Sequence, residues 1–207
     1  HLAVVYDGTD VKVYKNGTLL MTGGNATFGK PSSSDRFRIG DFAAGSGDWD
    51  GLISNLRIIK GRALYTAAFT PPTTALTATD DTVLLTCQDQ TVRDNSNLGH
   101  SVTVTGDTTF VNQGPFNGYS GNFDGSGDYI EIPASSDFSF TTAPWTFECW
   151  VYHKDWTTGA DVNGFQYMLY PQQPSHPTYP VAIAVHQGRY VIVDSNNYAL
   201  PWYSSYN

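Results

Sequence analysis

Three short apolar segments separated by tight-turn dipeptides open the chain. They read Leu2-Ala3-Val4-Val5-Tyr6, Asp7-Gly8, Val11-Lys12-Val13-Tyr14-Lys15, Asn16-Gly17 and Thr18-Leu19-Leu20-Met21. Asp-Gly and Asn-Gly supply the positive φ angles that tight hairpin turns need, and the central segment alternates apolar and polar residues. The pattern predicts a three-stranded antiparallel meander over residues 1–22.

The rest of the sequence continues with short strand-like runs between Gly-, Asn- and Pro-rich turns. Further strands are predicted at 36–40, 52–59, 83–87, 102–104, 110–111, 120–123, 129–133, 145–152, 165–170, 181–185 and 189–193. In the long run Trp145–Tyr152, the alternate residues Phe147, Cys149 and Val151 are expected to face a core. One helical turn is expected at Ala63–Phe69, ended by consecutive prolines. No segment keeps a 3.6-residue apolar period, so an all-β sandwich or barrel is predicted.

Composition restricts the classes of partner. Charged residues make up 14% of the 207 residues, and the net charge is −8. Apart from two Glu, the 19 acidic residues are Asp, which favours turns and caps rather than helices. An acidic chain with 11 Lys and Arg lacks the basic footprint for nucleic acid or anionic lipid. No apolar run approaches the roughly 18 residues of a membrane span, so no membrane insertion is expected.

Cysteine usage and the first residues bear on context. Cys87 and Cys149 lie in separate apolar runs, which favours two buried thiols; a disulfide requires that their strands lie close together. The segment His1–Tyr6 lacks the basic start of a signal peptide and has the pattern of a strand interior, so the chain is expected to be part of a longer sequence.

Four strings together carry a family resemblance. Ser120–Ile132 and Trp145–Tyr152 are similar to the early strands of laminin-G-like (concanavalin-A-like) jelly-roll domains, and His1–Gly17 is similar to a later hairpin. Gly51–Tyr65, with Phe69-Thr70-Pro71-Pro72, resembles the closing strand and tail of such domains in bacteriophage tail and fibre proteins. The resemblance implies an antiparallel two-sheet jelly-roll sandwich.

The strings stand in an unexpected order. Late-half strands at 1–72 precede early-half strands at 119–207, with a linker of short strands at 73–118 between them. Either two tandem sandwiches each contribute a half, or both halves build one sandwich in permuted order. A lone half would expose strand edges and half a core, so pairing within this chain is favoured over pairing with other sequence or a neighbouring chain.

The same superfold hosts glycoside hydrolases, so the acidic residues decide whether an enzyme is expected. A retaining glycosidase needs two carboxyl groups about 5 Å apart. The only glutamates, Glu131 and Glu148, each stand alone on a predicted strand. The chain also lacks a Gly-x-Ser-x-Gly nucleophile motif and a phosphate-binding Gly-Lys-Ser or Gly-Lys-Thr loop. A non-enzymatic protein without catalytic residues is therefore expected.

Two Asp-rich loops offer hard oxygen ligands of the kind that calcium prefers. The candidates are Asp48 and Asp50 in one loop and Asp124 and Asp128 in the other. The family resemblance also implies calcium at the sandwich rim. The competing interpretation, that these residues stabilise turns, is favoured because the ligand spacing of an EF-hand is absent.

Aromatic residues near the C-terminus suggest a carbohydrate platform, because flat rings beside amide side chains suit sugar stacking. The candidates are Trp156, Tyr170, Tyr179, Trp202 and Tyr203. Any one of them taken singly is more often a core or interface residue. Low charge and abundant aromatic residues also suit self-association.

These observations predict a virion surface or structural protein, such as a phage tail fibre, appendage or decoration protein. It would assemble with other virion proteins or copies of itself and bind host-surface glycans. The virion assignment rests on the resemblance of residues 51–72. A bacterial extracellular adhesin or surface-filament subunit is the alternative, and a polysaccharide-degrading enzyme is a weaker one.

Overall fold

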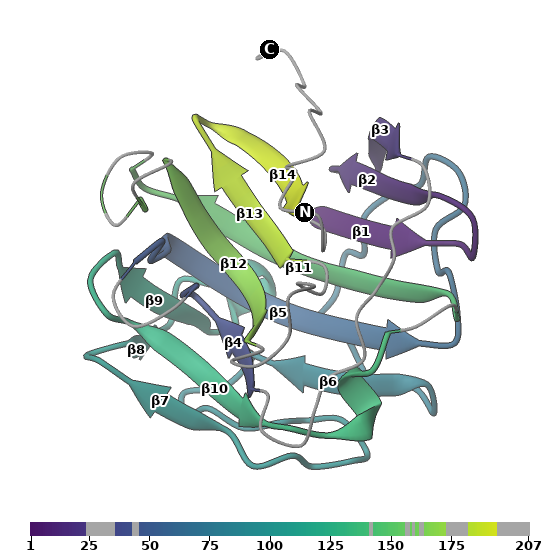
Figure 1. The fold of residues 1–207 in the computed structure, drawn as a ribbon. Helices are drawn as coiled ribbons and strands as arrows, with labels where there is room; N and C mark the ends of the chain where they lie inside the picture. The colour runs from purple at the N-terminus through teal and green to yellow at the C-terminus, as the bar shows by residue number, and fades with distance from the viewer. Residues whose placement is uncertain are drawn as a thin grey trace.

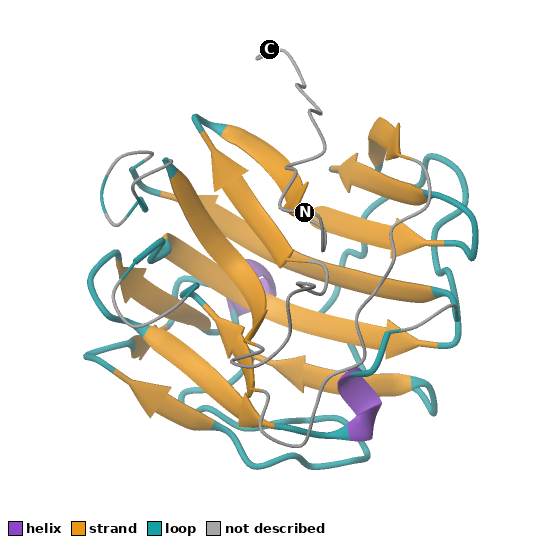
Figure 2. Ribbon diagram, in the orientation of Figure 1, coloured by secondary structure: helices purple, strands orange, loops and turns teal. Residues whose placement is uncertain are grey.

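A computed structural model describes residues 1–23, 36–42, 46–140, 143–155, 158, 160–161, 164–172 and 182–193. Within these ranges the chain forms strands and two single-turn 3₁₀ helices, η1 (Pro115–Asn117) and η2 (Ser136–Phe138) (Figure 2). The strands are β1 (Leu2–Tyr6), β2 (Val11–Lys15), β3 (Thr18–Gly23), β4 (Arg36–Ile39), β5 (Asp50–Lys60), β6 (Thr82–Thr86), β7 (Thr103–Thr105), β8 (Thr109–Val111), β9 (Ser120–Asp124), β10 (Tyr129–Pro133), β11 (Trp145–His153), β12 (Phe165–Gln172), β13 (Ala182–His186) and β14 (Arg189–Val193). No described segment is a helix long and apolar enough to cross a membrane.

Two antiparallel sheets lie face to face (Figure 1). Sheet A, behind in that view, has the order β3-β2-β1-β11-β5-β9-β8, and β6 pairs with β5 beside that path. Sheet B, in front, has the order β14-β13-β12-β4-β10-β7. The predicted all-β, two-sheet sandwich is confirmed, and the meander expected at 1–22 is β1, β2 and β3.

Each sheet combines strands from the two ends of the sequence. In sheet A, β11 lies between β1 and β5, and in sheet B, β4 lies between β10 and β12. The stretch 73–118, interpreted from sequence as a linker, supplies β6, β7 and β8. Within the described residues, the strands of 1–72 and those of 119–207 therefore pack around one common core.

Inward-facing side chains of both sheets build that interior. On β11, Phe147 and Cys149 are buried and Val151 packs against the same cluster, as their alternation predicts. Cys87 is buried too, and both cysteines are free thiols, so the bond that sequence left open is not formed.

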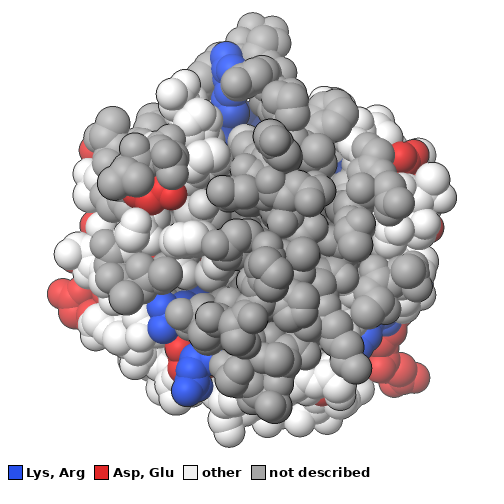
Figure 3. Space-filling view, in the orientation of Figure 1, with Lys and Arg blue, Asp and Glu red and all other residues white. Residues whose placement is uncertain are grey.

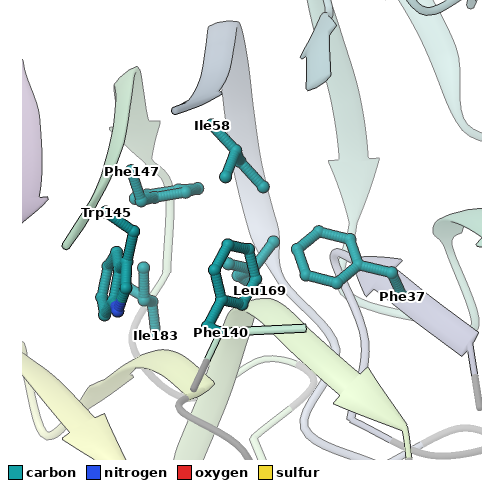
Figure 4. Close-up of a pocket in the computed structure, with 7 residues that line it drawn as sticks. All are labelled: Phe37, Ile58, Phe140, Trp145, Phe147, Leu169 and Ile183. Atoms are coloured by element: carbon teal, nitrogen blue, oxygen red, sulfur yellow. The ribbon is translucent and has the colours of Figure 1, made fainter. Parts of the chain in front are cut away.

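A small gap remains between the sheets. Its volume is about 20 Å³, room for roughly one water molecule. Figure 4 shows its apolar lining from both sheets: Phe37, Ile58, Phe140, Trp145, Phe147, Leu169 and Ile183. An apolar gap of this size is a packing imperfection rather than a ligand site.

Residues 61–81, here called the outer segment, cross the outer face of sheet A. The helical turn expected at Ala63–Phe69 is wrong, because the amides of this stretch find partners on the sheet instead. Leu64 donates its N–H to Thr146 Oγ1 over 2.8 Å, and Phe69 donates its N–H to the Gly17 carbonyl over 2.9 Å. Tyr65 and Phe69 pack over β1 and β2, so the outer segment covers that half of the face.

Candidate functional site

The uncovered half of sheet A's outer face carries three rows of side chains. Since Cys149 and Val151 face the core, Trp150, Tyr152 and Lys154 point outward. The strand registers place these residues beside neighbours on β5 and β9. The rows across β11, β5 and β9 are Trp150–Ser54–Ser120, Tyr152–Leu52–Asn122 and Lys154–Asp50–Asp124.

The first row is bounded on both sides, by the turn that contains η1 and by His1, which packs against the outer segment. Phe116 of η1 lies 5.1 Å from the Trp150 ring, centroid to centroid, and His1 lies 4.5 Å from it on the edge of the covered half. Ser54 donates its hydroxyl to the Tyr119 carbonyl over 2.6 Å, which fixes the turn that carries η1 against the sheet. In Figure 2, η1 is the coil seen behind the strands of sheet A.

A hollow of about 160 Å³ lies over the first two rows. The residues that line it are Leu52, Ser54, Gln113, Pro115, Ser120, Trp150, Val151 and Tyr152. None of them is charged. The Tyr152 ring is 65% exposed. Aromatic rings beside hydroxyl and amide groups are the chemistry with which proteins hold small polar molecules in orientation.

The third row brings charge to the open end of the hollow. Lys154 Nζ donates to Asn122 Oδ1 over 2.6 Å and lies 3.8 Å from Asp50 Oδ1. The cation is thus held between an amide and a carboxylate. The hollow therefore runs from an uncharged closed end at Trp150 to a charged open end at Lys154.

One comparison with known proteins bears on this surface. Residues 1–67 match the family model of the concanavalin A-like lectin/glucanases superfamily. The match includes β5, which supplies Leu52 and Ser54 to the hollow. It covers about a third of the chain and agrees with the resemblance drawn from the late hairpin and closing strand. No curated protein and no solved structure matches.

The carbohydrate-binding residues predicted from sequence are not those of the hollow. Trp156, Tyr179, Trp202 and Tyr203 lie outside the described residues. Tyr170 is only 4% exposed, and its ring lies 4.4 Å from Phe42 and 5.7 Å from Tyr167. It is a packed ring rather than an open platform. Trp150 and Tyr152 were missed, although the alternation that turns Cys149 and Val151 inward also turns them outward.

The Asp candidates fall into two groups. Asp124 and Asp128, together with Asp107, have carboxylate oxygens within 4.8 Å of one another. Asp107 was not predicted. Asp48 and Asp50 are outside this group, although Asp48 Oδ2 accepts a 2.9 Å hydrogen bond from the Gly127 N–H.

Three carboxylates can serve as calcium ligands, but several of their oxygens already accept hydrogen bonds from backbone amides. Asp128 Oδ1 accepts from Asp107 N–H over 2.8 Å, and Asp128 Oδ2 accepts from Asp124 N–H over 3.0 Å. Asp124 Oδ1 accepts from Ser126 N–H over 2.9 Å. These contacts give the carboxylates of Asp124 and Asp128 backbone partners, as the turn-forming interpretation expects.

A second buried pair, Asp41 and Asp48, lies in the loop between β4 and β5. Asp41 Oδ2 accepts from Arg38 over 2.7 Å, whereas none of the described residues donates to the Oδ1 atoms of Asp41 and Asp48. Burial, and next the negative charge of Asp48, raise the pKa of Asp41 to about 6.

Both glutamates are held in ion pairs on opposite outer faces of the sandwich. Glu148 of β11, fully buried, accepts from Arg57 and from the Tyr65 hydroxyl beneath the outer segment. Glu131 of β10 pairs with Arg36 and Arg38 on sheet B. Figure 3 shows acidic and basic atoms side by side over β10. The thickness of the sandwich separates the two carboxyl groups.

Proposed function

We propose that this protein is a non-enzymatic binding module that recognises glycans through the outer face of sheet A. The observation that carries the proposal is the uncharged hollow beside the exposed ring of Tyr152 and the half-buried ring of Trp150. A sugar offers C–H faces to these aromatic rings and hydroxyl groups to the exposed amide of Gln113. The concanavalin A-like match is consistent with such a role.

The non-enzymatic part of the proposal is supported by the surroundings of the two glutamates. Glycoside hydrolysis needs a proton donor and a second carboxylate close to each other and to the sugar. Glu148 is enclosed with Arg57 and Tyr65, and Glu131 lies on the other sheet. Neither lines the hollow.

We further propose that the module is displayed on a virion surface or tail and assembles there with other virion proteins or its own copies. This context is supported by the resemblance of residues 51–72 to closing strands of phage tail and fibre proteins. Electron microscopy of the source particle, with a labelled antibody against this chain, tests it. Labelling of a cell-surface filament instead would favour the bacterial adhesin.

Binding and turnover can be tested in one experiment. The protein is applied to an array of immobilised neutral and anionic oligosaccharides, and its retention at each position is measured. The oligosaccharides are then released and their masses are measured by mass spectrometry. We expect the protein to be retained by at least one oligosaccharide, whose mass is unchanged. Failure to bind any member of the array would overturn glycan recognition, and shortened products would overturn the non-enzymatic assignment.

A further inference from the structure

The shape of the hollow indicates which part of a glycan it holds. We infer that it binds the terminal residue of an uncharged glycan chain end-on, with the remaining chain leaving over Tyr152. This inference rests on the proposed glycan-binding function and names the ligand class of the same site.

The hollow is flanked on two sides and closed at one end. On the β1 side of Trp150, His1 contacts both the Trp150 ring and Phe69 of the outer segment, with centroid separations of 4.5 and 5.7 Å. On the β9 side, Pro115 of the η1 turn lines the hollow together with Ser54. Past Trp150 along β11, the next outward side chain is Glu148, which is buried and accepts from the Tyr65 hydroxyl of the outer segment. Tyr65 therefore blocks a chain that lies along β11, and the chain has to end at Trp150.

The turn that forms one wall is fixed rather than loosely attached. The Gly114 N–H donates to the Gly118 carbonyl over 2.9 Å, and the Ser54 hydroxyl holds the Tyr119 carbonyl. A Cβ atom at Gly114 would lie 2.6 Å from that same Tyr119 carbonyl oxygen, so the close crossing requires glycine. The wall is therefore part of the folded sheet surface.

At the end away from Trp150 the hollow is open. Two residues along a strand span roughly 7 Å, so Trp150 and Tyr152 offer successive contact positions rather than one. Tyr152 is 65% exposed and follows Trp150 along the strand toward the third row. A second sugar unit can rest on Tyr152, beside the amide of Asn122.

The charges define the ligand class. The lining of the hollow carries no charge, and Lys154 at its open end is held by Asn122 and Asp50. Burying a ligand carboxylate against Trp150, Ser54 and Ser120 would leave it without a counter-charge, which is costly. A terminal residue without acidic groups fits this surface.

Stoichiometry separates end-on from lengthwise binding. Isothermal titration is done with neutral homo-oligosaccharides of glucose, mannose, galactose, xylose and N-acetylglucosamine, each in short and long forms. One protein per chain is expected whatever the chain length, with an affinity that stops rising after the first few units. Stoichiometry that increases with chain length would overturn end-on binding while leaving glycan recognition intact.

A second measurement uses the wall itself. Phe116→Ala is expected to weaken binding roughly tenfold, because the terminal residue loses one side of its enclosure. Gln113→Ala, at an exposed lining position, is the second variant should Phe116→Ala lower the melting temperature.

Unchanged or tighter binding in a folded variant would contradict the closed end. Binding confined to sialylated or uronic-acid glycans would overturn the uncharged ligand class, and no binding by the wild type would instead remove the proposed function.

Discussion

Arg57 of β5 donates from Nε to Oε1 of Glu148 on β11 over 2.9 Å, at a place where the glutamate side chain has no solvent contact. The second glutamate oxygen accepts from the Tyr65 hydroxyl over 2.8 Å, and Arg57 Nη1 donates to the Thr77 carbonyl over 2.9 Å. One ion pair thus joins two neighbouring strands to both ends of the outer segment. The pair encloses Glu148 away from solvent and ties the outer segment to the sheet.

Removing one member of this pair is expected to be costly. Arg57→Ala leaves the buried carboxylate with only the His1 ring and the Tyr65 hydroxyl as side-chain partners among the described residues. It should lower the free energy of unfolding by about 3–5 kcal/mol, measured by urea denaturation. Glu148→Gln keeps an acceptor for Arg57 and a partner for Tyr65, so a smaller loss is expected. A Glu148→Gln protein that folds should still bind sugar. Equal, negligible losses in both variants would contradict the structural role.

Gly17 lets the outer segment approach β2. Its φ is +76°, and a Cβ there would lie 1.7 Å from the Phe69 carbonyl oxygen. Gly17→Ala therefore combines backbone strain with a steric clash and should cost roughly 3 kcal/mol of stability. Gly61→Ala is the matched control, because Gly61 also has a positive φ but open space at Cβ. A melting temperature lowered equally by both substitutions would show that the Phe69 contact is unimportant.

Asp128 is expected to act without a metal. Its two oxygens accept from two backbone amides, so Asp128→Ala leaves both donors unpaired and should cost about 2–4 kcal/mol. Asp128→Asn retains one acceptor and should lose about half as much. Addition of a chelator should leave the wild-type melting temperature unchanged in calorimetry. A clear drop with chelator, reversed by calcium, would replace this account with a metal site.

The raised pKa of Asp41 predicts a pH dependence of stability. The pKa rises from 3.8 to about 6, so near pH 5 the native protein holds a proton that the unfolded chain releases. This group therefore stabilises the native state most below about pH 4, and its contribution is lost as the pH rises through about 6.

Comparison with Asp41→Asn isolates that contribution, because the other acids are common to both proteins. The unfolding free energy of the wild type relative to the variant should fall between pH 4 and pH 6 and stay level above pH 7. A difference that does not change with pH would show that Asp41 titrates in the ordinary range.

The strand pattern could be predicted from sequence because its signals are local. Asp7-Gly8 and Asn16-Gly17 fix the first meander, and period-2 alternation identifies the inward face of β11. The conformation of the outer segment could not be predicted, because Ala63–Phe69 is held by Thr146 and by the Gly17 carbonyl, partners remote in sequence. The helical turn was expected from local propensity, whereas tertiary contacts determine the conformation of this stretch.

The candidate site was harder to predict for the same reason. The hollow needs β11, β5, β9 and the turn of η1 to come together, and their order across sheet A does not follow their order in the chain. Tyr170 was chosen as a ring near a loop, yet Phe42 and Tyr167 enclose it. Asp107 joins Asp124 and Asp128 through the pairing of distant segments, which no local spacing reveals.

Glycan recognition at the hollow requires contact between the sugar and the exposed ring of Tyr152. The most direct measurement is the affinity of wild type, Tyr152→Ala and Leu19→Ala for the neutral oligosaccharide that the wild type binds best. Leu19, 44% exposed on β3, controls for loss of a surface apolar side chain away from the hollow. We predict a loss of about tenfold or more for Tyr152→Ala, with its melting temperature and the Leu19→Ala affinity unchanged. Equal affinities for all three proteins would contradict the account.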